Sequence, residues 1–301
     1  MKAVTWHGKR DVRVETVPDP RIEQPTDAVI EVTSTNICGS DLHLYEVLGA
    51  FMTPGDILGH EPMGIVREVG SAVGNLKVGD RVVIPFQISC GNCYMCDLKL
   101  YTQCETTQVR EKGMGAALFG YSELYGSVPG GQAEYLRVPQ AQFTHIKVPL
   151  GPPDARFVYL SDVLPTAWQA VEYAAVPDGG SVTVLGLGPI GDMAARIAAQ
   201  RGYRVIGVDR VPERLARVEA RGIEVIDMQT LPEPLGDVIR GLTDGRGTDS
   251  VIDAVGMEAH GSPVAKAIQQ FSGLLPDMVA KPVMQKAGID RLEALYSAVD
   301  I

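Results

Sequence analysis

Residues 181–209 read SVTVLGLGPIGDMAARIAAQRGYRVIGVD and decide the fold of the second half of this 301-residue chain. A β-branched strand is followed by a helical stretch and by a second strand that ends in an acid. This order predicts a right-handed βαβ unit and a parallel sheet. Further strands are expected at 223–228 and 249–254, with helical stretches before each. The second half is therefore expected to be a doubly wound α/β domain of the Rossmann kind.

The glycines between the first strand and its helix predict a dinucleotide site. The hexapeptide GLGPIG contains Gly186, Gly188, Pro189, Ile190 and Gly191. Its glycines allow a tight turn and a close approach of the backbone, and the helix N-terminus offers free N–H groups to a pyrophosphate. The alternative is a glycine turn that only packs the helix on the strand.

The acid at the end of the second strand favours NAD over NADP. Asp209 follows Gly191 by 18 residues. A carboxylate at this position can accept both ribose hydroxyls of the adenosine and would repel a 2′-phosphate. Arg210 and Arg214 temper this preference because they could attract a phosphate.

The first half of the chain is predicted to be mainly β. Short β-branched runs at 28–32, 63–70, 80–85 and 133–139 are separated by turn residues. The connector KVPLGPPD and a helix with Pro165 near its start mark the change of pattern. We expect a mainly-β domain at 1–160, with a cysteine-rich lobe at 90–104, and a nucleotide-binding domain at 161–301.

Four of the five cysteines predict a closed zinc site. The stretch CGNCYMCDLKLYTQC holds Cys90, Cys93, Cys96 and Cys104. Four thiolates complete a tetrahedral zinc shell and leave no place for substrate, so this site is expected to stabilise the lobe. An iron–sulfur cluster is the rival, but Glu105 stands where bacterial ferredoxins have proline. Four free thiols are a further alternative.

The fifth cysteine predicts a second, open metal site. Cys38 lies 22 residues before His60, which Glu61 follows directly. A third ligand is needed, and the chain has no further cysteine. Asp162 is the better candidate, because Glu61 should point elsewhere if His60 faces the metal, although it could swing in. The alternative for Asp162 is the N-cap of the helix that follows.

Two polar residues after Cys38 are candidates for proton transfer. Ser40 and His43 are close enough in sequence to the metal ligand to carry a proton from an alcohol toward solvent. The alternative is that both are ordinary surface residues. His7, His145 and His260 have no partner motifs and are expected to be ordinary positions.

Composition limits the partners. The formal net charge is -10, and the sequence contains no cluster of Lys and Arg residues. Both observations argue against a nucleic-acid partner. The N-terminal MKAVTWHGKRDVRVE has neither an apolar signal core nor a membrane-spanning run. Metal-held thiolates are typical of a reducing compartment, so a cytoplasmic location is expected, with no membrane partner.

These motifs together resemble the zinc-dependent medium-chain dehydrogenases of the alcohol dehydrogenase superfamily. GHEPMGIVREVGSAV, from Gly59 to Val73, is similar to that family's zinc signature, and the four-cysteine lobe also matches. The segment SDVLPTAW and the long stretch before GGQAEY most resemble the glutathione-independent formaldehyde dehydrogenase branch. The resemblance implies a GroES-like catalytic domain before the Rossmann sheet. It also implies two Zn²⁺ per chain, one catalytic and one structural.

The same resemblance implies the chemistry. Zinc would polarise the oxygen of a small alcohol or aldehyde, and NAD would take the hydride. Formaldehyde is one candidate substrate. Ser40 and His43 would pass the proton by way of the coenzyme ribose. Cys38, His60 and Asp162 match the family's catalytic metal ligands.

One departure from the family concerns the end of the chain. Only four strands are expected in the nucleotide domain, whereas a full doubly wound domain has six, so the Rossmann sheet is expected to be C-terminally incomplete. The chain is expected to be a fragment of a longer gene or a shortened product, and a homo-oligomer if full-length. The alternative to an enzyme is a truncated zinc- and nucleotide-binding relative without turnover. A zinc-ribbon adaptor ranks last, because the glycine fingerprint is present.

Overall fold

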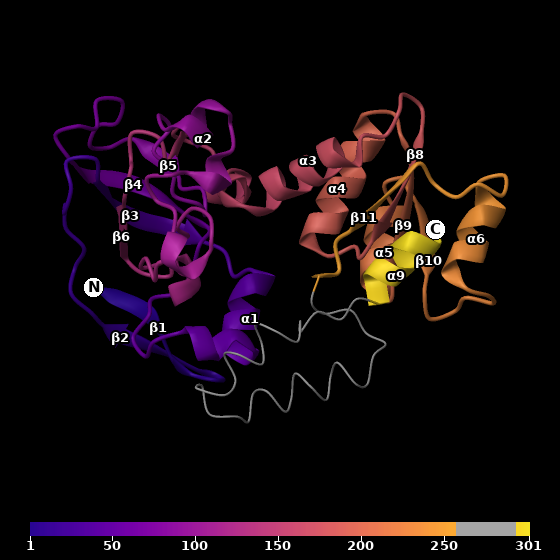
Figure 1. Cartoon of the computed structure of the whole chain (residues 1–301), viewed down its shortest axis with the longest axis horizontal. Coiled ribbons are helices and arrows are strands. Elements are labelled where there is room, and N and C mark those ends of the chain that lie inside the picture. Colours follow the sequence, from indigo (N-terminus) through magenta and orange to yellow (C-terminus); the bar gives the residue numbers. More distant parts are fainter. Residues whose placement is uncertain (257–292) are drawn as a thin grey trace. The chain divides into compact units, whose positions relative to one another are not determined.

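The computed structural model describes residues 1–256 and 293–301, which form two compact units that divide after Asp162. Each unit has its own sheets and its own core (Figure 1). Among the helices of the described residues, none is both long enough and apolar enough to cross a membrane.

The first unit is built on a five-stranded antiparallel sheet with the order β6-β3-β4-β5-β7. Its strands are β3 (Ala28–Thr35), β4 (Pro62–Val69), β5 (Arg81–Val83), β6 (Tyr135–Val138) and β7 (Ile146–Lys147). The four runs predicted as strands in this half all lie in this sheet. The core on one side of it includes Ile30, Val66, Val82, Phe119 and Leu136, all at most 1% exposed.

An N-terminal hairpin that the sequence reading did not predict precedes this sheet. Strands β1 (Lys2–Gly8) and β2 (Asp11–Thr16) pair antiparallel, and Ala3 forms an isolated bridge with Ala133. Trp6 of β1 is buried with Leu44, Met52 and Leu58. The hairpin therefore covers the segment that carries α1.

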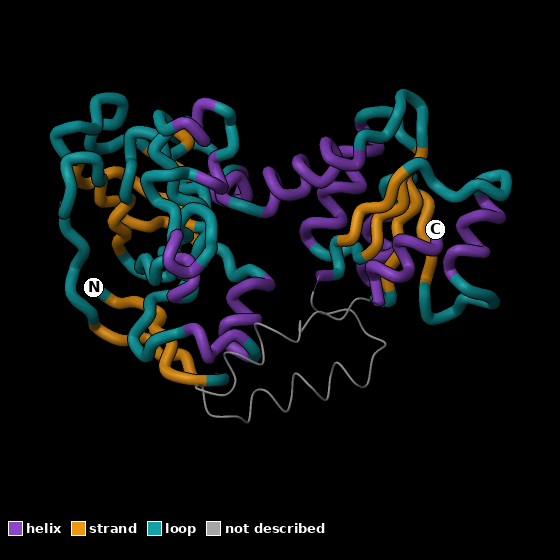
Figure 2. The backbone as a smooth tube through the Cα atoms, in the orientation of Figure 1, coloured by secondary structure: helices purple, strands orange, loops and turns teal. Residues whose placement is uncertain are grey.

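Short helices connect these strands. They are α1 (Gly39–Glu46), α2 (Tyr94–Asp97) and the 3₁₀-helices η1 (Leu48–Phe51), η2 (Tyr101–Gln103), η3 (Arg110–Lys112), η4 (Glu123–Tyr125), η5 (Asp154–Arg156) and η6 (Val158–Ser161). Loops make up most of the remaining chain in this unit (Figure 2). Cys38 caps the start of α1 and Asp162 follows the end of η6, whereas His60 and Glu61 directly precede β4.

The second unit is a parallel sheet with the order β10-β9-β8-β11. Its elements are α3 (Val163–Ala174), β8 (Ser181–Leu185), α4 (Pro189–Gln200), β9 (Arg204–Asp209), α5 (Pro212–Glu219), β10 (Glu224–Asp227), α6 (Leu235–Leu242), β11 (Ser250–Asp253) and α9 (Glu293–Asp300). The chain moves outward from β8 to β10 and then returns to the other side of β8, as in a Rossmann fold. The predicted βαβ pattern is confirmed.

Helices cover both faces of the parallel sheet. Apolar residues of α3, α4 and α5, such as Val171, Ala194 and Val218, pack with β8 and β9 in one core. On the other face, Ile239 of α6 packs with Ile206, and Ala298 of α9 packs against the same cluster. The chain is therefore an α/β protein with a GroES-like antiparallel sheet followed by a Rossmann-like sheet, as the sequence predicts.

Candidate active site

Four potential metal ligands converge at one place in the first unit. The Sγ atom of Cys38, a ring nitrogen of His60 and one carboxylate oxygen each from Glu61 and Asp162 all lie within 4.8 Å of one another. His60 and Glu61 are buried, and Cys38 and Asp162 are partly buried. A thiol, an imidazole and carboxylates are the ligands that Zn²⁺ prefers, so the donor set fits that ion.

Local structure explains how Cys38 is presented. Cys38 is the N-cap of α1, with φ -91° and ψ 164°, and the helix begins at Gly39. Its N–H donates to Oδ2 of Asp41 at 2.8 Å, which is half of a capping-box arrangement. Because this cap fixes the backbone of Cys38, the thiol is held at the start of the helix.

Glycines explain how His60 comes close to a neighbouring loop. Gly59 has φ +99°, and a Cβ added at Gly120 would lie 2.5 Å from the Gly59 nitrogen. A side chain at either position would separate these two segments. The chain bends at His60 just before β4, so His60 and Glu61 do not alternate as residues of a strand would.

The carboxylate of Glu61 also lies in the cluster, which agrees with the alternative that this side chain swings in toward the other three groups. Its Oε1 is 4.0 Å from Nε2 of His60, and its Oε2 accepts a hydrogen bond from Nδ2 of Asn36 at 2.8 Å. Burial raises the pKa of Glu61. Oε1 is buried and has no hydrogen-bond partner among the described residues, as expected of an oxygen beside a cation site.

His60 is placed between two carboxylates. Its Nε2 is 3.4 Å from Oδ2 of Asp162, and its Nδ1 is 3.3 Å from Oδ1 of Asp41. Burial alone would lower the pKa of His60, but the nearby carboxylates of Asp162 and Asp41 and the Cys38 sulfur outweigh burial and raise it to about 12. The cluster therefore stabilises positive charge, and a metal ion could take the place of that proton.

Two further residues, Asn36 and Asp41, contact the potential ligands Glu61 and His60. Neither residue belongs to a metal-binding sequence motif, and neither was predicted. The spacing of Asp41, three residues after Cys38, is that of an N-terminal helix cap and could have pointed to it. Asp41 is 4% exposed and also accepts a hydrogen bond from Nε2 of Gln132 at 3.3 Å. Such partners orient metal ligands in other proteins.

Of the two proton-transfer candidates, Ser40 lies beside the cluster. Its Oγ is 3.5 Å from Sγ of Cys38, and it lines a cavity together with His60 and Asp162. His43 lies one turn further along α1 and is not among the residues that line this cavity. The structure thus places both residues on one helix but only Ser40 at the cavity.

The cavity has a volume of about 150 Å³ and walls that the sequence reading did not identify. Besides Ser40, His60 and Asp162, it is lined by Phe86, Leu118, Tyr121 and Tyr125. Phe86, Leu118 and Tyr121 come from loops and Tyr125 ends η4, and none of these four lies in a recognisable motif. A larger groove of about 390 Å³ runs along β1 and the end of β3, but no residue of the metal cluster lines it.

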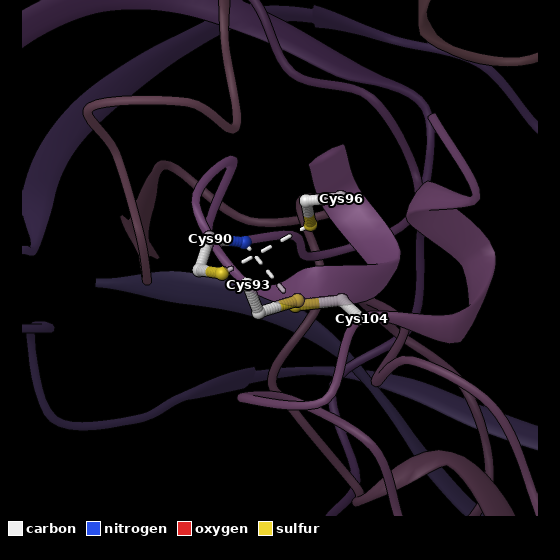
Figure 3. Close-up of side chains that lie close together, drawn as sticks. All are labelled: Cys90, Cys93, Cys96 and Cys104. Atoms are coloured by element: carbon white, nitrogen blue, oxygen red, sulfur yellow. Dashed lines mark hydrogen bonds between the residues drawn. The ribbon is translucent and has the colours of Figure 1, made fainter. Parts of the chain in front are cut away.

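The four cysteines of the lobe also converge, as Figure 3 shows. All four Sγ atoms lie within 4.8 Å of one another, with 3.9 Å between Cys90 and Cys96 and 4.0 Å between Cys93 and Cys104. The geometry suits one ion with four thiolate ligands.

Backbone amides point at these sulfurs. The N–H groups of Cys90 and Glu105 donate to Sγ of Cys104 and of Cys93, each at 3.3 Å. Burial alone would raise the pKa of the Cys104 thiol, but polar neighbours, including the Cys90 amide, lower it to about 6. Burial raises the pKa of Cys96 to about 12, so the lobe without a metal ion favours the thiolate at Cys104 and the neutral thiol at Cys96.

The other histidines lie outside both clusters as far as the structure describes them. Nε2 of His7 is 2.6 Å from a Glu15 carboxylate oxygen, and Nδ1 of His145 is 2.6 Å from the Ala141 carbonyl oxygen. His260 lies outside the described residues.

In the second unit, the glycine loop has the form that the sequence predicts. Gly186 has φ +84°, Gly188 is the N-cap of α4, and Pro189 opens the helix. A Cβ at Gly191 would overlap the carbonyl oxygen of Gly186, so only glycine allows the loop to pack this closely on the helix.

Asp209 ends β9 beside this loop. Its Oδ2 accepts the Leu187 N–H at 2.6 Å, and its Oδ1 accepts the N–H groups of Arg210 and Val211 at 2.6 and 2.9 Å. Nη1 of Arg214 is 3.6 Å from Oδ2. Asp209 therefore also ties the glycine loop to the end of its neighbouring strand, a structural role that sequence reading did not foresee.

Comparison with known proteins decides the family. Residues 24–149 match the model of the alcohol dehydrogenase GroES-like domain, and residues 189–271 match that of zinc-binding dehydrogenases. The chain is 43% identical over 304 residues to the uncharacterised zinc-type alcohol dehydrogenase-like protein AdhB of Bacillus subtilis. That alignment covers 98% of this chain and 79% of AdhB.

The chain belongs to the zinc-type alcohol dehydrogenase family.

Two further similarities agree with this family. It is 39% identical over 274 residues to formaldehyde dismutase of Pseudomonas putida, covering 86% of this chain and 66% of that protein. Its structure resembles alcohol dehydrogenase TADH from Thermus sp. ATN1 with a TM-score of 0.77 and 35% identity, covering 90% of this chain and 73% of TADH. The predicted family resemblance is confirmed.

Proposed function

We propose that this protein transfers a hydride between a small alcohol or aldehyde and NAD. The observation that carries the proposal is the convergence of Cys38, His60 and Asp162 on the wall of a small cavity. Three such groups bind zinc and leave a coordination position for a substrate oxygen.

The ligands suit a catalytic zinc ion in number and charge. Cys38 and Asp162 each bring one negative charge, which together offset Zn²⁺, and His60 adds a neutral nitrogen. The bound ion would act as a Lewis acid toward the substrate oxygen. Glu61 lies close enough to His60 to become a further ligand when the substrate position is empty. Four thiolates in the lobe would hold a second, structural zinc ion.

Ser40 is the proposed first acceptor of the substrate proton. Its hydroxyl lies on the cavity wall, 3.5 Å from the thiol of Cys38. Oxidation of an alcohol removes a hydride and a proton, so the site needs a path for the proton. We propose that Ser40 takes it and that His43, one turn along α1, carries it toward solvent.

The glycine loop and Asp209 are the proposed coenzyme contacts. Free N–H groups at the start of α4, after Gly188, suit a pyrophosphate. The negative charge of Asp209 would disfavour the 2′-phosphate of NADP and so favour NAD. Arg210 and Arg214 would weaken this preference for NAD, because their positive charges attract a phosphate. NAD supplies the acceptor for the hydride, so that alcohol and NAD⁺ give aldehyde, NADH and a proton.

Formaldehyde or a formaldehyde adduct is one candidate substrate. The support comes from the names of two relatives, formaldehyde dismutase and the glutathione-independent formaldehyde dehydrogenase of Pseudomonas aeruginosa, which is 37% identical over 272 residues. A cavity of about 150 Å³ suits a substrate with few non-hydrogen atoms.

Steady-state turnover tests the proposal. Zinc-loaded protein is mixed with short alcohols and NAD⁺, or with short aldehydes and NADH, and nicotinamide fluorescence is followed. We expect turnover, with a higher kcat/KM for NAD than for NADP. Failure to turn over any of these substrates by protein that carries two zinc ions would instead favour a zinc- and nucleotide-binding relative without catalysis.

A further inference from the structure

The cavity beside the metal cluster has walls of two kinds. Phe86 and Leu118 are apolar, whereas Tyr121 and Tyr125 each carry a phenolic hydroxyl. Neither hydroxyl makes a hydrogen bond to another of the described residues. A simple aliphatic substrate would leave any hydroxyl that it covers without a partner, and this lowers affinity.

Tyr121 is the better positioned of the two tyrosines. Its ring meets the ring of His60 edge to face, with centroids 6.4 Å apart and an interplanar angle of 86°. The ring of Tyr125 lies behind it, with centroids 5.5 Å apart. Tyr121 is thus in ring contact with the metal ligand, whereas no ring contact joins Tyr125 to His60 among the described residues.

The position of Tyr121 is fixed by its surroundings. Its neighbour Gly120 has φ +55° and packs so closely on Gly59 that no side chain fits there. The Gly120 N–H donates to the Val128 carbonyl oxygen at 2.8 Å. Tyr121 also packs against the buried cluster around Trp6 and Leu44. A ring held this firmly can select a substrate by geometry.

We propose that Tyr121 is a specificity-determining residue that hydrogen-bonds a second hydroxyl of the substrate. The preferred substrates are then short diols or hydroxyaldehydes, rather than aliphatic alcohols of the same size. A site that hydrogen-bonds a substrate hydroxyl rejects an analogue without it, because its own polar group is then unpaired. This inference rests on the proposed function, since it concerns the same cavity.

A matched substrate pair tests the inference by kinetics. 1,2-Ethanediol and 1-propanol have the same number of non-hydrogen atoms but differ in the second hydroxyl. We expect a higher kcat/KM for the diol, and Tyr121→Phe should reduce the diol-to-propanol ratio by about tenfold. Most of the change should come from the diol.

Tyr125→Phe is the matched control, because it removes the same atom from the next ring in the same cavity. It should leave the diol-to-propanol ratio nearly unchanged. If Tyr125→Phe abolishes the preference and Tyr121→Phe does not, the assignment to Tyr121 is wrong. A wild-type ratio that already favours propanol also overturns the inference.

Binding without turnover separates this inference from the proposed function. Cobalt(II) replaces zinc, coenzyme is left out, and the visible spectrum is titrated with each alcohol. The four-thiolate lobe has no position for an alcohol, so spectral changes report the site of Cys38, His60 and Asp162. We expect tighter binding of the diol in wild type and equal binding in Tyr121→Phe.

The two proposals can then fail separately. If no alcohol is oxidised but the cobalt protein still prefers the diol in a Tyr121-dependent way, the hydride-transfer function fails and the specificity inference stands. If alcohols are oxidised but neither assay shows a preference for the diol, the specificity inference fails and the function stands.

Discussion

Oδ1 of Asp41 lies 3.3 Å from Nδ1 of His60, while Oδ2 of the same carboxylate accepts the Cys38 N–H at 2.8 Å. One buried aspartate therefore contacts the segments that carry two of the proposed zinc ligands. Because His60 turns its Nδ1 toward Asp41, its Nε2 faces Asp162 and the cavity. A carboxylate in this position fixes the ring of a ligating histidine and increases its basicity.

Asp41→Asn should weaken metal binding at this site by about 10- to 100-fold. Asparagine keeps an oxygen that can accept the Cys38 N–H, but it loses the negative charge beside His60. Chelator competition on the zinc-loaded protein measures the effect. Asp178→Asn, which makes the same charge change at an exposed position, should have no effect. Equal chelator sensitivity of Asp41→Asn and wild type would remove Asp41 from the support of the metal.

Asp162→Ala should remove one zinc ion and leave the ion of the four-cysteine lobe. The reason is that Cys38 and His60 alone give too few strong ligands to retain zinc. Asp162→Cys should restore a second ion, because a thiolate supplies the same charge. Native mass spectrometry counts the ions, and two zinc ions per chain in Asp162→Ala would show that Asp162 is not a ligand.

Cys96→Ser should release the lobe ion and lower the thermal midpoint by roughly 5 °C or more. Cys96 is 3% exposed, so a serine hydroxyl there is a poorer ligand in a buried place. The metal of the Cys38 site should remain. Thermal denaturation and zinc analysis give the two readouts, and Asn92→Ser is the control from the same loop. A midpoint equal to that of the control argues against a stabilising ion in the lobe.

Asp249→Asn should destabilise the protein near neutral pH but much less in acid. Hydrogen bonds from the Ser181 N–H and hydroxyl, at 2.8 and 3.0 Å, lower the pKa of Asp249 in the folded state. A lowered folded pKa adds stability above the unfolded value of about 3.9, and that stability is lost as the pH falls through the folded pKa.

Urea unfolding of metal-free protein at about pH 6 and about pH 3 measures this pH dependence. The gap between wild type and Asp249→Asn should shrink in acid, whereas Asp178→Asn should show no gap at either pH. A gap of constant size at both pH values would mean that the charge of Asp249 does not carry the effect.

Local patterns allowed much of the fold to be predicted. The strands β8 and β9 are apolar and flank a glycine turn, and Val182, Val184 and Ile206 are fully buried. The hairpin β1–β2 was not predicted because most side chains of β2 are exposed, including Val14 at 71%. This strand is held by backbone pairing with β1 rather than by burial of its side chains. Helix α1 was missed because it begins with CGSD, which resembles a turn.

The candidate site was only partly predictable for a similar reason. Cys38, His60 and Asp162 are chemically distinctive, and the structure brings them together. Tyr121 and Asp41 acquire their positions from tertiary packing, through Gly120 on Gly59 and through the cap of α1. Neither residue type is rare enough to stand out before the fold is known.

Anomalous diffraction at the zinc absorption edge on the metal-loaded protein tests the central claim most directly. We expect two peaks, one amid the four lobe sulfurs and one about 2.3 Å from Sγ of Cys38, with His60 and Asp162 as further ligands and one position open to solvent or substrate. A single peak in the lobe would contradict the account. So would a second ion whose every position is permanently filled by protein.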